Sequence, residues 1–233
     1  MALDWFEPIR AYCERGGPGF WAEPLNAVSN AAFLVAAGLA VVRERTSPAR
    51  DPACLGLAAL TGLVGLGSFL FHTLAVRWTM LADVVPIALF IHAYFFLALH
   101  RFLGLGRAGA ALATLAFAAF GFGLGPAIEA VTGRPSTEFA NGSVEYLPAA
   151  LALAGVAGAL LARRDRPARR AAGLRLAAIA GLFLLSLAFR TFDRAACAAY
   201  PLGTHALWHL LNAGVLYGLI ATALRDRTRA GRA

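Results

Sequence analysis

Three histidines and one aspartate interrupt stretches of the sequence that are otherwise apolar. His205 and His209 are four residues apart, so on a helix their imidazoles project from the same face and can bind one metal ion. With His72 they make a three-histidine set, which leaves the fourth position of a tetrahedral zinc ion to water. Zinc lowers the pKa of such a water to about 7 and polarises a bound carbonyl, and Asp83 is then suited to act as the general base on the zinc-bound water. The pattern predicts metal-assisted hydrolysis.

The composition indicates that membrane helices position these residues. Of the 233 residues, 59% are hydrophobic and only 15% are charged, whereas a water-soluble domain carries about a quarter charged residues. Apolar runs of about 20 residues, long enough to cross a bilayer, recur along the chain. We expect an all-α membrane protein, a seven-transmembrane helix bundle in a single domain over residues 1–233. It would have an external N-terminal segment (1–22), a polar external loop near 129–145, and spans near 24–42, 53–76, 78–99, 108–127, 146–162, 171–189 and 203–224.

The basic residues predict the orientation of these spans. All 21 are arginines, and fourteen of them follow the first, third, fifth and seventh spans, which end on the same side, whereas six lie on the other side. The positive-inside rule puts the C-terminus in the cytoplasm and the N-terminus outside. Arginines placed between spans are typical of topology signals and not of nucleic-acid binding. The absence of lysine excludes a retinal Schiff base, and with it a rhodopsin.

In this topology the candidate residues lie at one depth. The span near 53–76 runs outwards and carries His72 near its outer end, while Asp83, His205 and His209 lie in the first turns of spans that begin outside. Ser68 precedes His72 by four residues and shares its helix face. Ionisable groups are costly in lipid and usually mark a functional pathway. We therefore expect a site towards the extracytoplasmic face.

The pattern Ser68-x3-His72-x10-Asp83, followed by His205-x3-His209, resembles that of the alkaline ceramidase family. This family belongs to the seven-helix zinc hydrolase superfamily that includes the adiponectin and progestin receptors. An N-terminal Cys-Glu and the stretch Ala-Glu-Pro-Leu-Asn-Ala-Val-Ser-Asn are similar to the family's opening pattern, and the resemblance covers essentially the whole chain. It implies an amidase that cuts the N-acyl bond of ceramide, a membrane lipid, into a sphingoid base and a fatty acid. The histidines would hold zinc, the aspartate would activate the zinc-bound water, and the serine would stabilise the oxyanion.

The resemblance also implies a calcium ion near the zinc. Family members bind it through an N-terminal Asp-Trp-x-Glu-x-Asn stretch and a later glutamate. The favoured register gives Glu14, Glu23 and the carbonyl of Tyr12 as ligands, whereas a second register, at residues 4–7, lies too far from Glu23. Neither register supplies the six or more oxygens that calcium prefers. The alternative is that Glu14 is a solvated loop residue and that Glu23 caps the first span.

A disulfide between Cys13 and Cys197 is the last feature that the resemblance implies. Both cysteines fall on the expected external side, where an oxidising compartment permits the bond.

Two other classes of protein compete with the hydrolase. One is a seven-helix lipid-sensing receptor that keeps zinc as a structural element, and the other is a b-type haem electron carrier with paired histidines. The alanine-, leucine- and arginine-rich composition is typical of a GC-rich bacterial genome, so we expect a multi-pass protein of the bacterial inner membrane. Many bacteria make no conventional sphingolipid, which leaves another N-acylated lipid open as the substrate.

Overall fold

The computed structural model describes residues 4–48, 50–163 and 166–230. Residues 1–3 of the predicted external segment, and Arg164 and Arg232 of the arginine clusters, lie outside this range. The described chain is helical and contains no named strand. Its elements are α1 (Pro24–Ser29), α2 (Ala31–Arg45), α3 (Pro52–Leu74), α4 (Arg77–Arg101), α5 (Arg107–Thr132), the 3₁₀ segment η1 (Ser136–Tyr146), α6 (Leu147–Leu161), α7 (Pro167–Ala196) and α8 (His205–Ala230).

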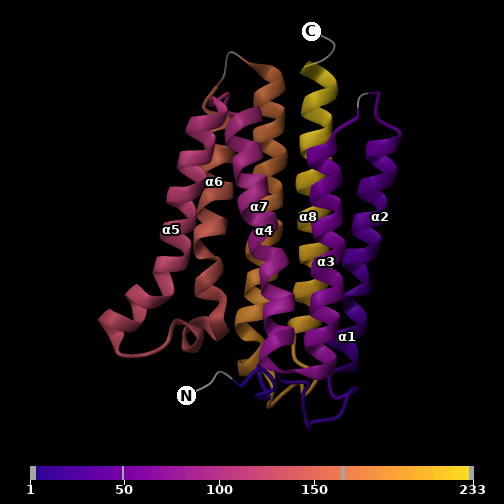
Figure 1. The fold of residues 1–233 in the computed structure, drawn as a ribbon, viewed down its shortest axis with the longest axis vertical. Helices are drawn as coiled ribbons and strands as arrows, with labels where there is room; N and C mark the ends of the chain where they lie inside the picture. Colours follow the sequence, from indigo (N-terminus) through magenta and orange to yellow (C-terminus); the bar gives the residue numbers. More distant parts are fainter. Residues whose placement is uncertain (1–3, 49, 164–165, 231–233) are drawn as a thin grey trace.

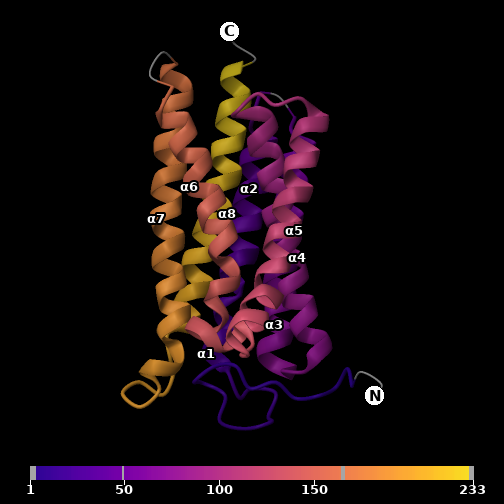
Figure 2. The ribbon, with the colours of Figure 1, turned by 90° about the vertical axis from the view of Figure 1, so that its left-hand side faces the viewer.

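These elements make seven helical segments long and apolar enough to cross a membrane, so the predicted fold class of an all-α integral membrane protein is confirmed. The helices lie side by side along the long axis (Figures 1 and 2), with the N-terminal segment folded against the end of the bundle opposite the end of α8. The first span combines α1 and α2, and the fifth combines η1 and α6. In chain order, the candidate membrane spans are residues 24–45, 52–74, 77–101, 107–132, 136–161, 167–196 and 205–226.

The predicted external loop near 129–145 is wrong in part. Helix α5 continues to Thr132 and ends where Gly133 adopts a left-handed conformation (φ 69°), a common helix stop. The residues that follow form the short turns of η1, which pack against α5, α6 and α7. Ser136 and Ser143 are buried there, so this polar segment is part of the bundle.

Helices α3 and α4 approach each other through a glycine. A Cβ added to Gly67 would lie 1.9 Å from the carbonyl oxygen of Ala82, so only glycine fits at this point. Ser68 and Asp83 are the next residues on the two helices. The same contact therefore fixes the relative positions of these two candidate site residues.

We expect the substitution Gly67→Ala to push α4 away from α3. The overlap is with backbone, which cannot rotate aside, so the free energy of unfolding should fall by about 1–3 kcal/mol. Gly62→Ala is the matched control on the same helix, because its nearest neighbour, the Cβ of Ala37, is 3.8 Å away. Thermal unfolding in detergent measures both. Equal melting temperatures for the two variants would show that this close approach is not required.

The N-terminal segment is held against the turn between α3 and α4. The Ile9 amide donates to the carbonyl oxygen of Ala75 (2.7 Å), and the Arg77 amide donates to that of Glu7 (3.1 Å). The segment thus covers the end of the bundle at which α3 finishes and α4 begins (Figure 1).

Candidate metal centre

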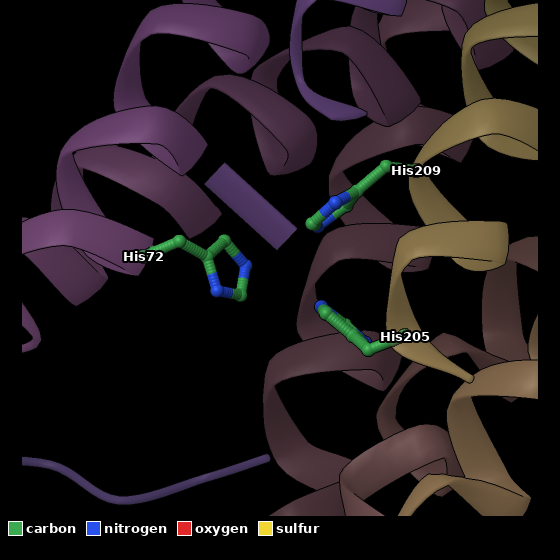
Figure 3. Close-up of side chains that lie close together, drawn as sticks. All are labelled: His72, His205 and His209. Carbon is green, nitrogen blue, oxygen red and sulfur yellow. The ribbon is translucent and has the colours of Figure 1, made fainter. Parts of the chain in front are cut away.

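Three imidazoles meet in the interior of the bundle. His72 comes from the last turns of α3, and His205 and His209 from the first turns of α8, as Figure 3 shows. One ligand nitrogen from each lies within 4.8 Å of the others, and all three side chains are at most 1% exposed. Among the described residues this is the group of three or more histidine, cysteine or acidic side chains close enough to hold one metal ion.

Hydrogen bonds set the tautomer of two of these rings. The Nδ1 of His72 is 2.6 Å from a carboxylate oxygen of Glu23, which can only accept. The Nδ1 of His209 is 2.7 Å from the hydroxyl of Ser29, whose own proton goes to the carbonyl oxygen of Asn26 (2.8 Å). Each Nδ1 therefore carries the proton, and each Nε2 keeps a free lone pair. Metal-binding histidines are oriented by such partners.

The unpaired nitrogens fit a metal ion. His72 Nε2 and His205 Nδ1 are buried and have no hydrogen-bond partner in the described part of the chain. Buried polar atoms without a partner are rare, because such an atom loses its hydrogen bonds to water and gains none in the folded protein. A divalent cation that prefers imidazole nitrogen, such as zinc, would satisfy these atoms.

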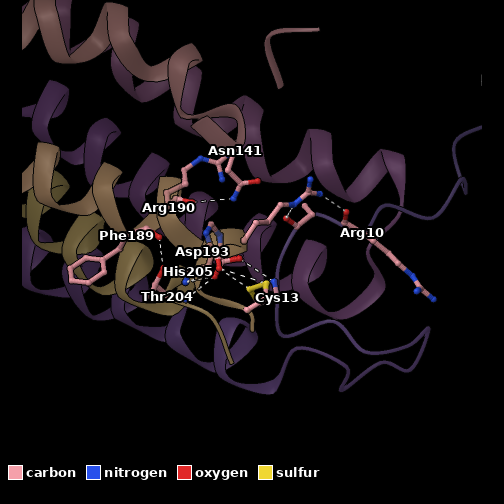
Figure 4. The surroundings of a disulfide bond; sticks show 11 residues. Arg10, Cys13, Asn141, Phe189, Arg190, Asp193, Thr204 and His205 are labelled. Carbon is pink, nitrogen blue, oxygen red and sulfur yellow. Dashed lines mark hydrogen bonds between the residues drawn. A yellow bond between two sulfur atoms is a disulfide. The ribbon is translucent and has the colours of Figure 1, made fainter. Parts of the chain in front are cut away.

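Asp193 positions the start of α8. One of its carboxylate oxygens accepts from the amides of Thr204 (2.7 Å) and His205 (3.0 Å), and the other accepts from the amide of Cys13 (3.0 Å). Figure 4 shows these bonds beside the disulfide that joins Cys13 to Cys197, whose Cα atoms are 5.4 Å apart. The structure therefore brings together the two cysteines that the resemblance pairs. This buried carboxylate, which no sequence motif indicated, fixes the backbone of a metal-facing histidine.

Ser68 and Asp83 lie beside the histidines. Both are buried, at 2% and 9% exposure, and both line the same cavity as His205 and His209. The Asp83 carboxylate interacts with the Ser68 hydroxyl. The structure thus gathers all five residues that the sequence assigned to the zinc and catalytic site.

The remaining two histidines lie apart from this group. His92 Nδ1 is 2.7 Å from the carbonyl oxygen of Ala88, one turn earlier on α4, and its ring stacks on Phe122. His100 Nδ1 is 2.8 Å from the carbonyl oxygen of Leu105. Both rings are thus satisfied locally.

The cavity beside the histidines has a volume of about 460 Å³. Near the histidines its wall is polar and includes Arg190 and Asn141. Farther along the bundle it is apolar, with side chains from four helices: Phe90, Tyr94, Val156, Leu176, Leu216 and Leu219. A chamber of this size and character suits a hydrocarbon chain with a polar group at the histidine end.

The residues expected to bind calcium have other partners. The Glu14 carboxylate accepts from the amides at the start of α1, those of Leu25 (2.7 Å) and Asn26 (2.8 Å). Glu23 binds His72 and the buried guanidinium of Arg15, which also donates to the carbonyl oxygen of His72 (2.8 Å). Burial would raise the pKa of the Glu23 carboxyl, but bonds from His72, Arg15 and Asn26 hold it below its ordinary value.

Tyr12 was expected to offer its backbone carbonyl, and its side chain lies against the histidine cluster. Its ring stacks on that of His205, with centroids 3.5 Å apart, and its hydroxyl accepts from Arg190 (2.7 Å). Because an internal arginine already neutralises Glu23, a calcium ion would meet a positive charge. With their present partners, the carboxylates of Glu14 and Glu23 do not fit a calcium ion.

We therefore expect the protein to be indifferent to calcium. Treatment with EGTA should leave the melting temperature unchanged, because Arg15 already supplies the positive charge beside Glu23. The zinc chelator 1,10-phenanthroline should lower the melting temperature by removing an ion from the histidines. Thermal unfolding with calcium titrated back measures the difference. A saturable rise in melting temperature with calcium would contradict this expectation.

Fold and centre together define a class of protein: an integral membrane helix bundle that encloses a histidine cluster able to hold a metal ion beside a lipid-sized cavity. The family model described as Ceramidase matches residues 18–232. The chain therefore belongs to the ceramidase family, as its sequence pattern predicted. No curated protein matches the chain.

Proposed function

We propose that the protein is a zinc-dependent amidase that hydrolyses the N-acyl bond of ceramide or a ceramide-like membrane lipid. The products would be a sphingoid base or other amine and a fatty acid, as for an N-acylsphingosine amidohydrolase. The observation that carries this proposal is the convergence of three buried imidazoles with unpaired nitrogens, beside a carboxylate, at the polar end of an apolar cavity. Membership of the ceramidase family supports the amide bond as the target.

His72, His205 and His209 would hold the zinc ion. When bound, zinc would polarise the amide carbonyl and make a coordinated water more acidic. The chain's own contribution is to orient these rings. Glu23 and Ser29 do this for two of them by accepting the Nδ1 protons.

Asp83 and Ser68 would carry the proton transfer and the oxyanion contact. Asp83 would take a proton from the attacking water and deliver it to the amide nitrogen as the carbon–nitrogen bond breaks. The Ser68 hydroxyl, next to it in the cavity, would donate to the carbonyl oxygen as negative charge develops there. The burial of both residues would strengthen these interactions because water does not compete for them.

The cavity would bind the acyl chain. Its apolar length lies along the bundle, while the histidines mark its polar end. A lipid bound in this way would place its amide carbonyl at the metal centre with the hydrocarbon buried. We also propose that this end faces the extracytoplasmic side of a bacterial inner membrane, because the arginine-rich connections lie at the other end.

Metal analysis combined with a lipid-amide screen tests the proposal. We expect about one zinc ion per chain, release of fatty acid from at least one N-acyl lipid, and loss of release after treatment with 1,10-phenanthroline that zinc reverses. Stoichiometric zinc without hydrolysis of any amide would contradict the enzyme and favour a receptor with a structural zinc. A Soret band in the purified protein would indicate haem instead.

A further inference from the structure

Arg190 places a positive charge in the wall of the cavity. It lies near the end of α7, and its guanidinium carbon is 5.7 Å from the ring centroid of Tyr12, 5.4 Å from that of Tyr146 and 5.7 Å from that of Trp208. Asn141 donates to its backbone carbonyl (3.0 Å), which fixes this part of the helix (Figure 4). The guanidinium is thus enclosed by aromatic faces within the membrane-spanning part of the chain.

No carboxylate of the described residues forms an ion pair with this guanidinium. Its Nη1 donates to the Tyr12 hydroxyl (2.7 Å), and its Nε is buried without a partner. Two acidic side chains that line the same cavity have other partners, since Glu138 binds Arg134 and Glu145 accepts from Ser136. The remaining one, Asp83, lies beside the histidines and interacts with Arg190 only over a longer distance.

A buried cation without a counter-ion is costly, and charged groups inside a membrane usually pair with another polar group or mark a substrate or ion pathway. Aromatic faces recover part of this cost. The unpaired Nε shows that the hydrogen-bonding capacity of the group is not used by the chain itself. A guanidinium also has the planar donor geometry that matches carboxylate and phosphate oxygens.

We propose that Arg190 binds an anionic group on the amine half of the substrate. The preferred substrate class is then an N-acyl lipid that carries a carboxylate or phosphate next to the amide, such as an N-acyl amino acid, and not a neutral ceramide. This inference rests on the proposed amidase function and deepens it by naming the substrate class.

The position of Arg190 along the cavity assigns the anion to the amine side. The apolar wall lies beyond the histidines and takes the acyl chain, so the amide carbonyl is at the histidines and the amine half points to the polar end. Tyr12 connects the two sites directly, since its ring stacks on His205 while its hydroxyl binds Arg190. An anion on Arg190 is thus close to the scissile bond.

The reaction balances without another reactant. Water adds its oxygen to the acyl carbon, the carbon–nitrogen bond breaks, and a proton passes to the nitrogen. The products are a fatty acid and an amine that keeps its carboxylate or phosphate.

A matched substrate series tests the proposal. Four amides with the same acyl chain are compared on the zinc-loaded protein: an N-acyl amino acid, its neutral methyl ester, an N-acyl phosphoethanolamine and ceramide. We expect kcat/KM for at least one anionic amide to exceed that for ceramide and the ester by about 100-fold, mainly through KM, because the contact is a buried charge-assisted bond. Comparison of the N-acyl amino acid with the N-acyl phosphoethanolamine shows whether a carboxylate or a phosphate binds better.

Variants separate this role from a structural one. Arg190→Gln should remove the preference for the anionic amide, lowering kcat/KM for the anionic amides far more than for the neutral ones, and Arg190→Lys should restore part of this preference. Arg77→Gln is the control, because this exposed arginine at the same end of the bundle binds Glu7 and does not line the cavity. Melting temperatures check that each variant is folded, and binding of a non-hydrolysable anionic analogue gives a readout without turnover.

The outcomes distinguish the two proposals. Hydrolysis of ceramide as fast as of the anionic amides, or an equal fall in kcat for all four substrates with Arg190→Gln, would overturn the anionic substrate class while the amidase stands. Hydrolysis of none of the four, with zinc bound, would contradict the amidase itself.

Discussion

Replacing Asp83 with asparagine should strongly slow amide hydrolysis and leave zinc bound. Asparagine has nearly the same shape and can still interact with Ser68, but it cannot take a proton from water. General-base catalysis contributes about 10²–10⁴-fold to a rate, so kcat should fall by that factor. Fatty-acid release, measured with metal content on the same sample, gives the result. The unchanged shape keeps the close contact between α3 and α4 at Gly67.

Two further measurements make the Asp83 prediction decisive. The melting temperature of Asp83→Asn should stay near that of the wild type, because the substitution removes a charge that burial disfavours. Ser68→Ala should be less severe, since it removes one oxyanion contact and keeps the base. If Asp83→Asn retains wild-type kcat, another group is the base and the proposed mechanism is wrong.

Substituting His205 with alanine should release the zinc ion and eliminate activity together. Loss of a partner that merely orients a ligand costs about 10–100-fold in metal affinity, so loss of a ligand itself should cost more. Only two of the three converging imidazoles would remain. Metal content after dialysis and fatty-acid release measure the two effects.

His92→Ala is the matched control for the metal prediction. It removes a membrane-embedded imidazole of the same size whose Nδ1 is satisfied by a carbonyl oxygen of its own helix. It should retain zinc and activity. His209→Gln provides a second test that keeps most of the side-chain volume. Full zinc occupancy in both His205→Ala and His209→Gln would show that the metal binds elsewhere.

The spans and the composition of the centre were predictable from the sequence because both depend on strong local signals. Apolar runs bounded by arginines define the helices, and ionisable residues within such runs are few. The i, i+4 spacing of His205 and His209 places them on one helix face. What the pattern could not give was the distance to His72, which depends on how α3 packs beside α8.

Arg190 was not among the predicted site residues, because it lies just beyond the predicted end of the sixth span. The sixth span was expected to end at residue 189, whereas α7 continues to Ala196. Arginine near a span end is an ordinary topology signal, so nothing in its type or spacing distinguished it. Its aromatic surroundings come from three segments far apart in the chain, and such long-range packing has no local signature.

Glu23 was assigned to calcium for a similar reason. Its spacing from Glu14 matched a family pattern, but the positive charge beside it comes from Arg15 of the chain itself. The guanidinium reaches Glu23 across a turn of the N-terminal segment, and the carboxylate then orients His72. The role of Asp193 could not be predicted from a motif either. Its carboxylate accepts hydrogen bonds from backbone amides, which every residue except proline provides.

The two histidines of α8 follow His72 by more than 130 residues, so His72 is synthesised well before them. Until α8 has entered the bilayer and docked beside α3, the early imidazole can offer the ion a single nitrogen. Metal loading is therefore tied to the docking of α8 beside α3. A nascent chain in which α8 has not docked would then lack the amidase activity proposed above.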